Sequence, residues 1–128
     1  MERLVFAYVE GSDLHEHAEH LVAAFGALAG RWRSLGAHVV NELHERTPDM
    51  HADDLTDWSL GIHIPLQEFG AHQAEELLPF LRGLAQATGR EFIVGIVEAS
   101  GIAEDLVFIG ANSGEQERRN LLLHVAGV

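Results

Sequence analysis

The chain has 128 residues, 47% of them hydrophobic, so it is long enough to form one domain with a substantial core. It carries 20 acidic residues against eight arginines, has no lysine and has a formal net charge of −12. Binding to phosphate backbones needs clustered cationic side chains, so this balance argues against direct nucleic-acid binding and favours a basic protein partner. The absence of cysteine excludes disulfides and thiolate chemistry.

The N-terminus lacks the basic region and cleavage site of a signal peptide, and no apolar run approaches the roughly 18–20 residues that span a bilayer. A cysteine-free chain of this kind is compatible with a reducing compartment. We therefore expect one cytoplasmic domain over residues 1–128, without membrane contact.

The first half of the chain predicts a strand, a helix and a second strand. Residues 4–9 are continuously apolar and rich in β-branched and aromatic side chains, which favours a buried strand. A long helix follows, capped by Ser12 or Asp13 and ended by Gly36, with an apolar stripe at spacings of three and four. Residues 38–44 read as a second strand that is half polar.

The second half begins with an acidic stretch at residues 45–57, which we expect to be an exposed loop. Residues 58–66 then alternate apolar and polar, the pattern of a half-buried strand. A helix from Gly70 to Gly89 follows, interrupted by Pro79. Residues 91–98 and 106–110 predict an antiparallel hairpin, and residues 115–126 a final helix.

The order β-α-β-β-α-β-β-α predicts an α+β sandwich whose first six elements form a ferredoxin-like, split βαβ unit, with an added C-terminal strand and helix. Several strands are apolar on both faces, so the second face of the sheet needs a cover. We expect the C-terminal helix to provide it, with a homodimer as the alternative.

The most unusual charge feature is the interval from Thr47 to Leu81, which contains seven carboxylates and no basic residue. Such carboxylates are either solvated or reserved for a cationic partner. An aromatic residue beside them can anchor an interface while the charges steer association. The predicted partner-binding residues are Glu45, Asp49, Asp53, Asp54, Asp57 and Trp58.

A metal site is conceivable at the start of the first helix. On a helix that begins there, Asp13, Glu16, His17 and His20 would share one arc. The patterns of zinc proteases fail here by one residue, so an ordinary solvated helix face is the favoured interpretation. The sequence predicts no cofactor.

Strand histidines offer a third possibility. His44 and His63 lie on predicted strands, where Glu42 or Glu98 could pair with either imidazole and make it a general base. A partly exposed histidine without a catalytic role is the simpler alternative.

We therefore expect an acidic binding module that masks the basic surface of a toxin or nucleic-acid-handling protein, as a bacterial immunity protein, antitoxin or other inhibitor does. The alternative is a small ferredoxin-like enzyme or ligand-binding domain that uses histidine and carboxylate groups, with or without a metal. Because the sequence contains no catalytic motif, binding is favoured over catalysis.

Overall fold

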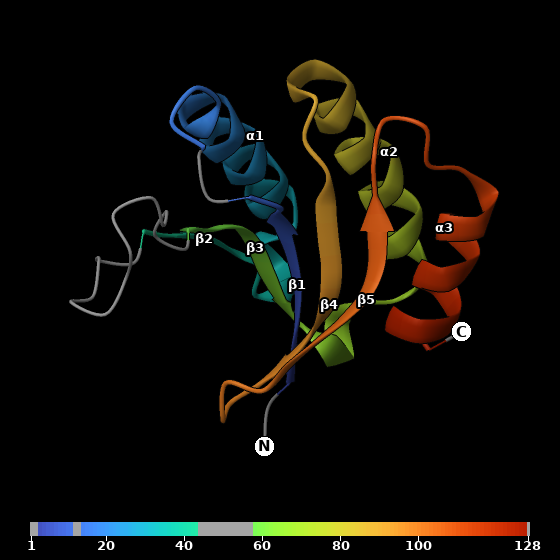
Figure 1. Ribbon diagram of the computed structural model, residues 1–128. Helices are drawn as coiled ribbons and strands as arrows, with labels where there is room; N and C mark the ends of the chain where they lie inside the picture. The colour runs from blue at the N-terminus through green and yellow to red at the C-terminus, as the bar shows by residue number, and fades with distance from the viewer. Residues whose placement is uncertain (1–2, 12–13, 44–57, 128) are drawn as a thin grey trace.

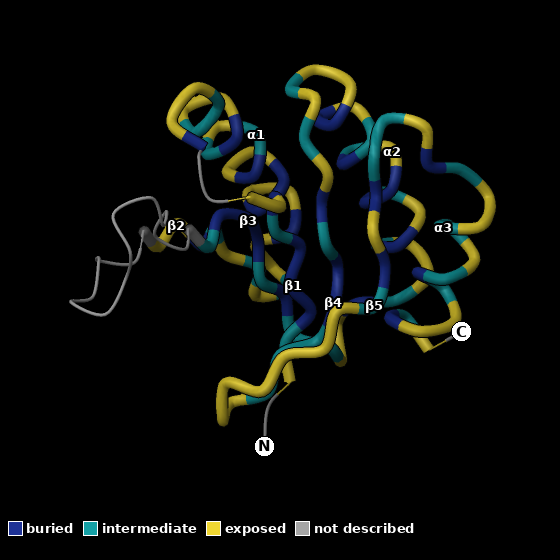
Figure 2. Tube along the Cα trace, viewed as in Figure 1, coloured by how far each residue is buried: buried dark blue, intermediate teal, exposed yellow. Residues whose placement is uncertain are grey.

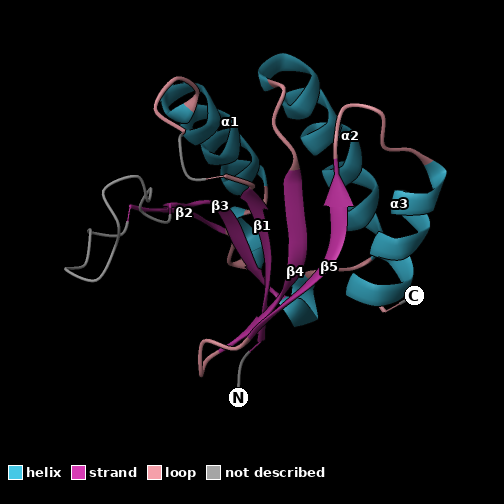
Figure 3. Ribbon diagram, viewed as in Figure 1, coloured by secondary structure: helices cyan, strands magenta, loops and turns pink. Residues whose placement is uncertain are grey.

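The computed structural model describes residues 3–11, 14–43 and 58–127. In that part of the chain, five strands form one antiparallel sheet in the order β2-β3-β1-β4-β5, accompanied by three α-helices (Figures 1 and 3). The α+β class predicted from the sequence is confirmed. The strands are β1 (Arg3–Val9), β2 (His38–Leu43), β3 (Trp58–Pro65), β4 (Phe92–Glu98) and β5 (Ala103–Ile109).

The helices are α1 (Ala18–Arg31), α2 (Ala71–Thr88) and α3 (Glu115–Asn120), and α3 continues into a π-helical turn over Leu121–Val125. Short 3-10 turns cover Arg33–Leu35 and Leu66–Glu68. The predicted hairpin of the last two strands is confirmed, with a register shift between Val94 and Gly95.

The first helix begins later than the sequence suggested. Leu14 lies in a turn closed by a 3.0 Å hydrogen bond from the His17 amide to its carbonyl, and α1 starts only at Ala18. Leu14 is nevertheless fully buried, so it reaches the core from the turn. Gly36, expected to end this helix, instead ends the following 3-10 turn in the left-handed conformation, with φ of 89°.

One hydrophobic core lies between the helices and one face of the sheet (Figure 2). Alternate strand residues such as Val5, Ile62 and Val94 meet Phe25 of α1 and Leu81 of α2 there. The C-terminal segment joins the same core through its buried Leu121 and Val125.

The predicted cover of the second sheet face is wrong. The α3 segment packs against α2 and β5, in the same layer as the other helices (Figure 1). Its apolar residues Leu121 and Val125 are buried in the shared core. In the described part of the chain, no helix covers the opposite face of the sheet.

Candidate functional site

The uncovered side of the sheet is the candidate site, and we call it the open face. Strand residues alternate between the two sides of a sheet, so the register assigns those residues that do not join the core to this side. Its central members are Leu4, Phe6, Tyr8, His38, Val40, Glu42, Gly61, His63, Ile93, Gly95, Val97 and Phe108.

Phe6 gives the open face a packed apolar centre. Its side chain is only 3% exposed although no described helix lies over it. The ring stacks on Tyr8 with centroids 4.7 Å apart, and it lies over Gly95, where an added Cβ would come within 2.7 Å of the Phe6 Cζ. Glycine is therefore required at position 95 for the ring to lie flat on the sheet.

Several polar side chains lie between Phe6 and the β2 edge of the sheet. The Tyr8 hydroxyl is hydrogen-bonded to Nε2 of His63 on the neighbouring strand β3. The His38 ring of β2 meets the His63 ring edge to face, with centroids 5.4 Å apart. Three adjacent strands thus supply one continuous row of aromatic and imidazole rings.

The surroundings of this row shift the pKa values of His63 and Tyr8. Burial is the main cause that holds the pKa of the His63 imidazole below its ordinary value, and the nearby His38 lowers it further. Glu42 acts in the opposite direction. Burial and the charge of Glu42 raise the pKa of Tyr8 to about 12. Tyr8 is therefore a neutral phenol near pH 7 and His63 a mainly neutral imidazole, which is able to accept a proton.

The open face is also acidic. Glu42 on β2, Glu91 just before β4 and Asp105 on β5 are all exposed carboxylates. The described strands contain a single arginine, Arg3. It is two residues from the core-facing Val5 on β1, so it is on the core side of the sheet and not on the open face. Apolar rings and carboxylates on a face to which no described strand contributes an arginine suit a cationic partner.

Most of the predicted partner-binding residues, namely Glu45, Asp49, Asp53, Asp54 and Asp57, lie outside the described residues. Trp58 is the first residue of β3 and pairs with Leu43 of β2.

The metal candidates do not share one helix. Asp13 lies outside the described residues, Glu16 and His17 belong to the turn before α1, and His20 is exposed within α1. No three histidine or acidic side chains of the described chain are grouped so that they could hold a metal ion.

The predicted grouping of histidine and carboxylate is met in part. His63 and Glu42 share the open face, whereas the register of Glu98 follows the buried Phe92 and Val94, and His44 lies outside the described residues. No sequence pattern singles out Tyr8 or His38 as members of this group. The alternation in residues 58–66 already placed His63 away from the core, but no local pattern links it to a tyrosine 55 residues away.

No protein-family model matches the chain, and neither curated proteins nor solved structures show a significant match. Within the described ranges, no helix is sufficiently long and apolar to traverse a lipid bilayer.

Proposed function

We propose that this protein is an acidic protein-binding module that masks a basic surface of its partner, in the manner of an immunity protein or other inhibitor of a toxin or nucleic-acid-handling protein. The observation that carries this proposal is the position of the three helices, which all lie on one side of the sheet. They leave open a face that combines aromatic rings with carboxylates and, among the described strand residues, has no arginine.

The two parts of the open face have different tasks in this proposal. The exposed carboxylates Glu42, Glu91 and Asp105 attract the basic partner at long range and raise the association rate. The exposed ring of Phe108 supplies contact area once the surfaces meet. We also assign Asp49, Asp53, Asp54 and Asp57, which lie outside the described residues, to the binding of the same partner.

We further infer a ferredoxin-like arrangement for the first six elements. Their order β-α-β-β-α-β, together with the neighbour order β2-β3-β1-β4, supports a split βαβ unit, to which β5 and α3 are added. An antiparallel sheet with helices on one side and a free opposite side suits a rigid recognition surface. We place the protein in the cytoplasm, where a cysteine-free chain meets reducing conditions.

Affinity capture from the native host tests the proposal. The wild type is compared with a triple variant, Glu42→Gln, Glu91→Gln and Asp105→Asn, which removes three charges from the open face. A matched variant, Glu16→Gln, Glu19→Gln and Glu68→Gln, removes three exposed charges elsewhere. We expect the open-face variant to lose the partner while the matched variant keeps it, and capture that is insensitive to salt and to both variants contradicts the proposal.

A second copy of this chain is a less suitable occupant of the open face. Both copies would bring the same carboxylates into the interface, and like charges brought together there oppose association. Light scattering distinguishes the two cases, since a basic partner leaves the isolated protein monomeric whereas self-association gives twice the monomer mass.

A second candidate function rests on the hydrogen bond between Tyr8 and His63. A mainly neutral imidazole held by a phenol, with Glu42 nearby, is the arrangement of a general base in a small enzyme or ligand-binding domain. If that function is the correct one, His63→Gln abolishes ligand turnover or binding but leaves partner capture unchanged.

A further inference from the structure

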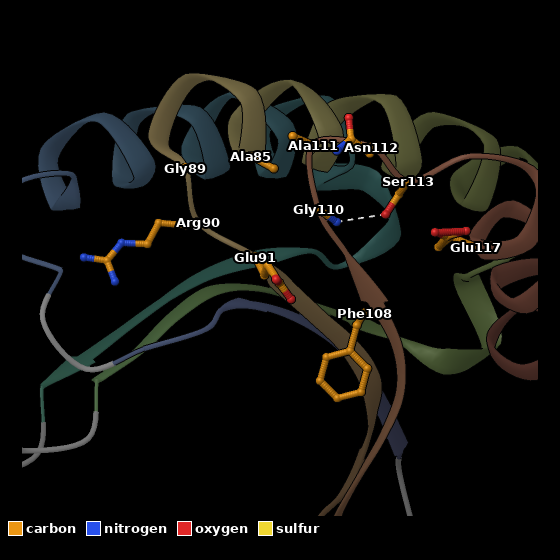
Figure 4. Close-up of a pocket in the computed structure, with 10 residues that line it drawn as sticks. All are labelled: Ala85, Gly89, Arg90, Glu91, Phe108, Gly110, Ala111, Asn112, Ser113 and Glu117. Atoms are coloured by element: carbon orange, nitrogen blue, oxygen red, sulfur yellow. Dashed lines mark hydrogen bonds between the residues drawn. The ribbon is translucent and has the colours of Figure 1, made fainter.

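A pocket of about 450 Å³ lies at the end of the sheet where β4 begins and β5 ends (Figure 4). Its walls come from the C-terminal end of α2, the two residues just before β4, the end of β5 with the segment after it, and α3. The volume is in the range of sites that take small ligands or single side chains. It adjoins the open face, because Phe108 belongs to both.

The wall formed by residues 110–113 is held firmly in place. The Gly110 amide donates a 2.8 Å hydrogen bond to Oγ of Ser113 (Figure 4). The Ser113 amide donates a 3.2 Å bond to the Gly110 carbonyl. Arg82 of α2 donates to the Ser113 carbonyl and Gln86 to the Ala111 carbonyl, at 3.1 and 3.2 Å. A preformed wall lowers the ordering cost of binding.

The pocket has an apolar ring and two carboxylates that lie on opposite sides of Gly110. Phe108 is 52% exposed at this position, which is unusual for a phenylalanine on a strand. Glu91 lies just before β4 and Glu117 in α3 (Figure 4). Gly110 leaves the space between them open, since an added Cβ there would lie 3.7 Å from Cγ of Glu91.

The arginine that lines the pocket, Arg90, points away from its carboxylates. Arg90 also lines it, but its guanidinium lies beside Gly11, with Nη1 3.0 Å from the position that a Cβ on Gly11 would take. Figure 4 shows this guanidinium directed away from Phe108 and Glu117. Two carboxylates, Glu91 and Glu117, and one cation, Arg90, thus line the pocket, and the cation points away from them.

We propose that this pocket receives an arginine side chain of the basic partner, an inference that rests on the proposed function. A guanidinium is planar and apolar on its faces, so it can stack on the Phe108 ring. Its edge donors can form charge-assisted hydrogen bonds with a carboxylate that lines the pocket, Glu91 or Glu117. The pocket thus supplies the specific anchor of an interface whose wider acidic surface supplies attraction.

NMR titration of the full chain with N-acetyl-L-arginine methylamide tests the anchor without any partner. The matched probe is the citrulline analogue, which has the same shape and no charge. We expect the arginine probe to shift the amide signals of Gly110 and Asn112 in a saturable way, and the citrulline probe to bind at least about fivefold more weakly. Equal shifts with both probes, or none with arginine, overturn the inference.

Variants separate the contributions of ring, charge and space. Phe108→Ala and Glu117→Gln should each weaken the arginine probe by about two- to fivefold. Gly110→Ala keeps every charge and narrows the pocket, so it should also weaken binding. Glu68→Gln removes an exposed carboxylate outside the pocket and should change nothing. An identical response of all four variants contradicts the assignment of the site.

The two proposals can fail separately. If the arginine probe does not bind but capture of a basic partner still depends on Glu42, Glu91 and Asp105, the pocket assignment is wrong and the proposed function stands. If the probe binds while capture ignores these charges, the pocket is an arginine site and the proposed function is wrong.

Discussion

Tyr8 and His63 lie on neighbouring strands, two residues out of direct register, and are joined by a hydrogen bond from the phenol hydroxyl to the imidazole Nε2. Phe6 is directly opposite His63, and Gly61 is directly opposite Tyr8. The bond therefore runs diagonally across the open face, beside the stacked ring of Phe6. It couples the packing of this face to the protonation of one histidine.

This coupling predicts a pH-dependent stability. The pKa of His63 is lowered in the folded state, mainly by burial, so the unfolded chain takes up a proton on this imidazole more readily. The contribution of His63 to stability is complete above about pH 6.5 and is lost as the pH falls toward its lower, folded pKa. Urea denaturation from about pH 5 to 8 should show a smaller acid loss for His63→Gln than for the wild type. Parallel stability curves for the two proteins would refute this.

Gly95 should tolerate no side chain. An added Cβ would lie 2.0 Å from the Glu104 carbonyl oxygen and 2.7 Å from the Phe6 ring, so the hairpin or the ring has to move. Gly95→Ala should lower the free energy of unfolding by about 2 kcal/mol or more. The matched variant Gly83→Ala, in the exposed part of α2 with no atom near the new Cβ, should raise it by about 0.5–1 kcal/mol. Both values follow from chemical denaturation, and similar effects at the two sites would be inconsistent with this packing.

Glu76 stabilises the pair of helices α1 and α2 through a buried indole. The Glu76 carboxylate accepts a 3.2 Å hydrogen bond from Nε1 of Trp32, which is 4% exposed, and a 2.9 Å bond from Arg31. Burial opposes ionisation of Glu76, but these hydrogen bonds and the charge of Arg31 hold the pKa of the carboxyl below its ordinary value.

Glu76→Ala leaves the buried indole donor without this acceptor and should cost about 1–2 kcal/mol of unfolding free energy. Arg31→Ala removes an exposed ion-pair partner and should cost less than about 1 kcal/mol. Glu76→Gln keeps an oxygen acceptor and should fall between them. Thermal and urea unfolding measure all three, and an Arg31 variant as unstable as Glu76→Ala would show that the ion pair dominates.

The order of the elements could be predicted because each strand and helix carries its own apolar period. The start of α1 could not, since Leu14 fits the apolar stripe by spacing alone. Its burial is real, but it is achieved from a turn closed between His17 and Leu14. Burial at helical spacing therefore does not prove that the backbone is helical.

The side of the sheet that α3 covers was predicted wrongly because it depends on long-range contacts. The segment after β5 is tied to α2 by Arg82 and Gln86, which keeps α3 in the helical layer. The apolar residues that seemed to need a second cover are partly satisfied within the sheet, as Phe6 is by Tyr8 and Gly95. The row of Tyr8, His63 and His38 likewise depends on strand pairing that no local pattern specifies.

We propose that a partner binds the open face and the pocket beside it, and not the exposed surface of the helical layer. Phe108 and Leu123 provide matched positions, since their side chains are 52% and 53% exposed and they lie on β5 and on the helical C-terminal segment. A benzophenone photocrosslinker placed at each position in the native host measures which surface contacts the partner. We expect a covalent adduct from position 108 and none from position 123. An adduct from position 123 alone, or equal adducts from both, would contradict it.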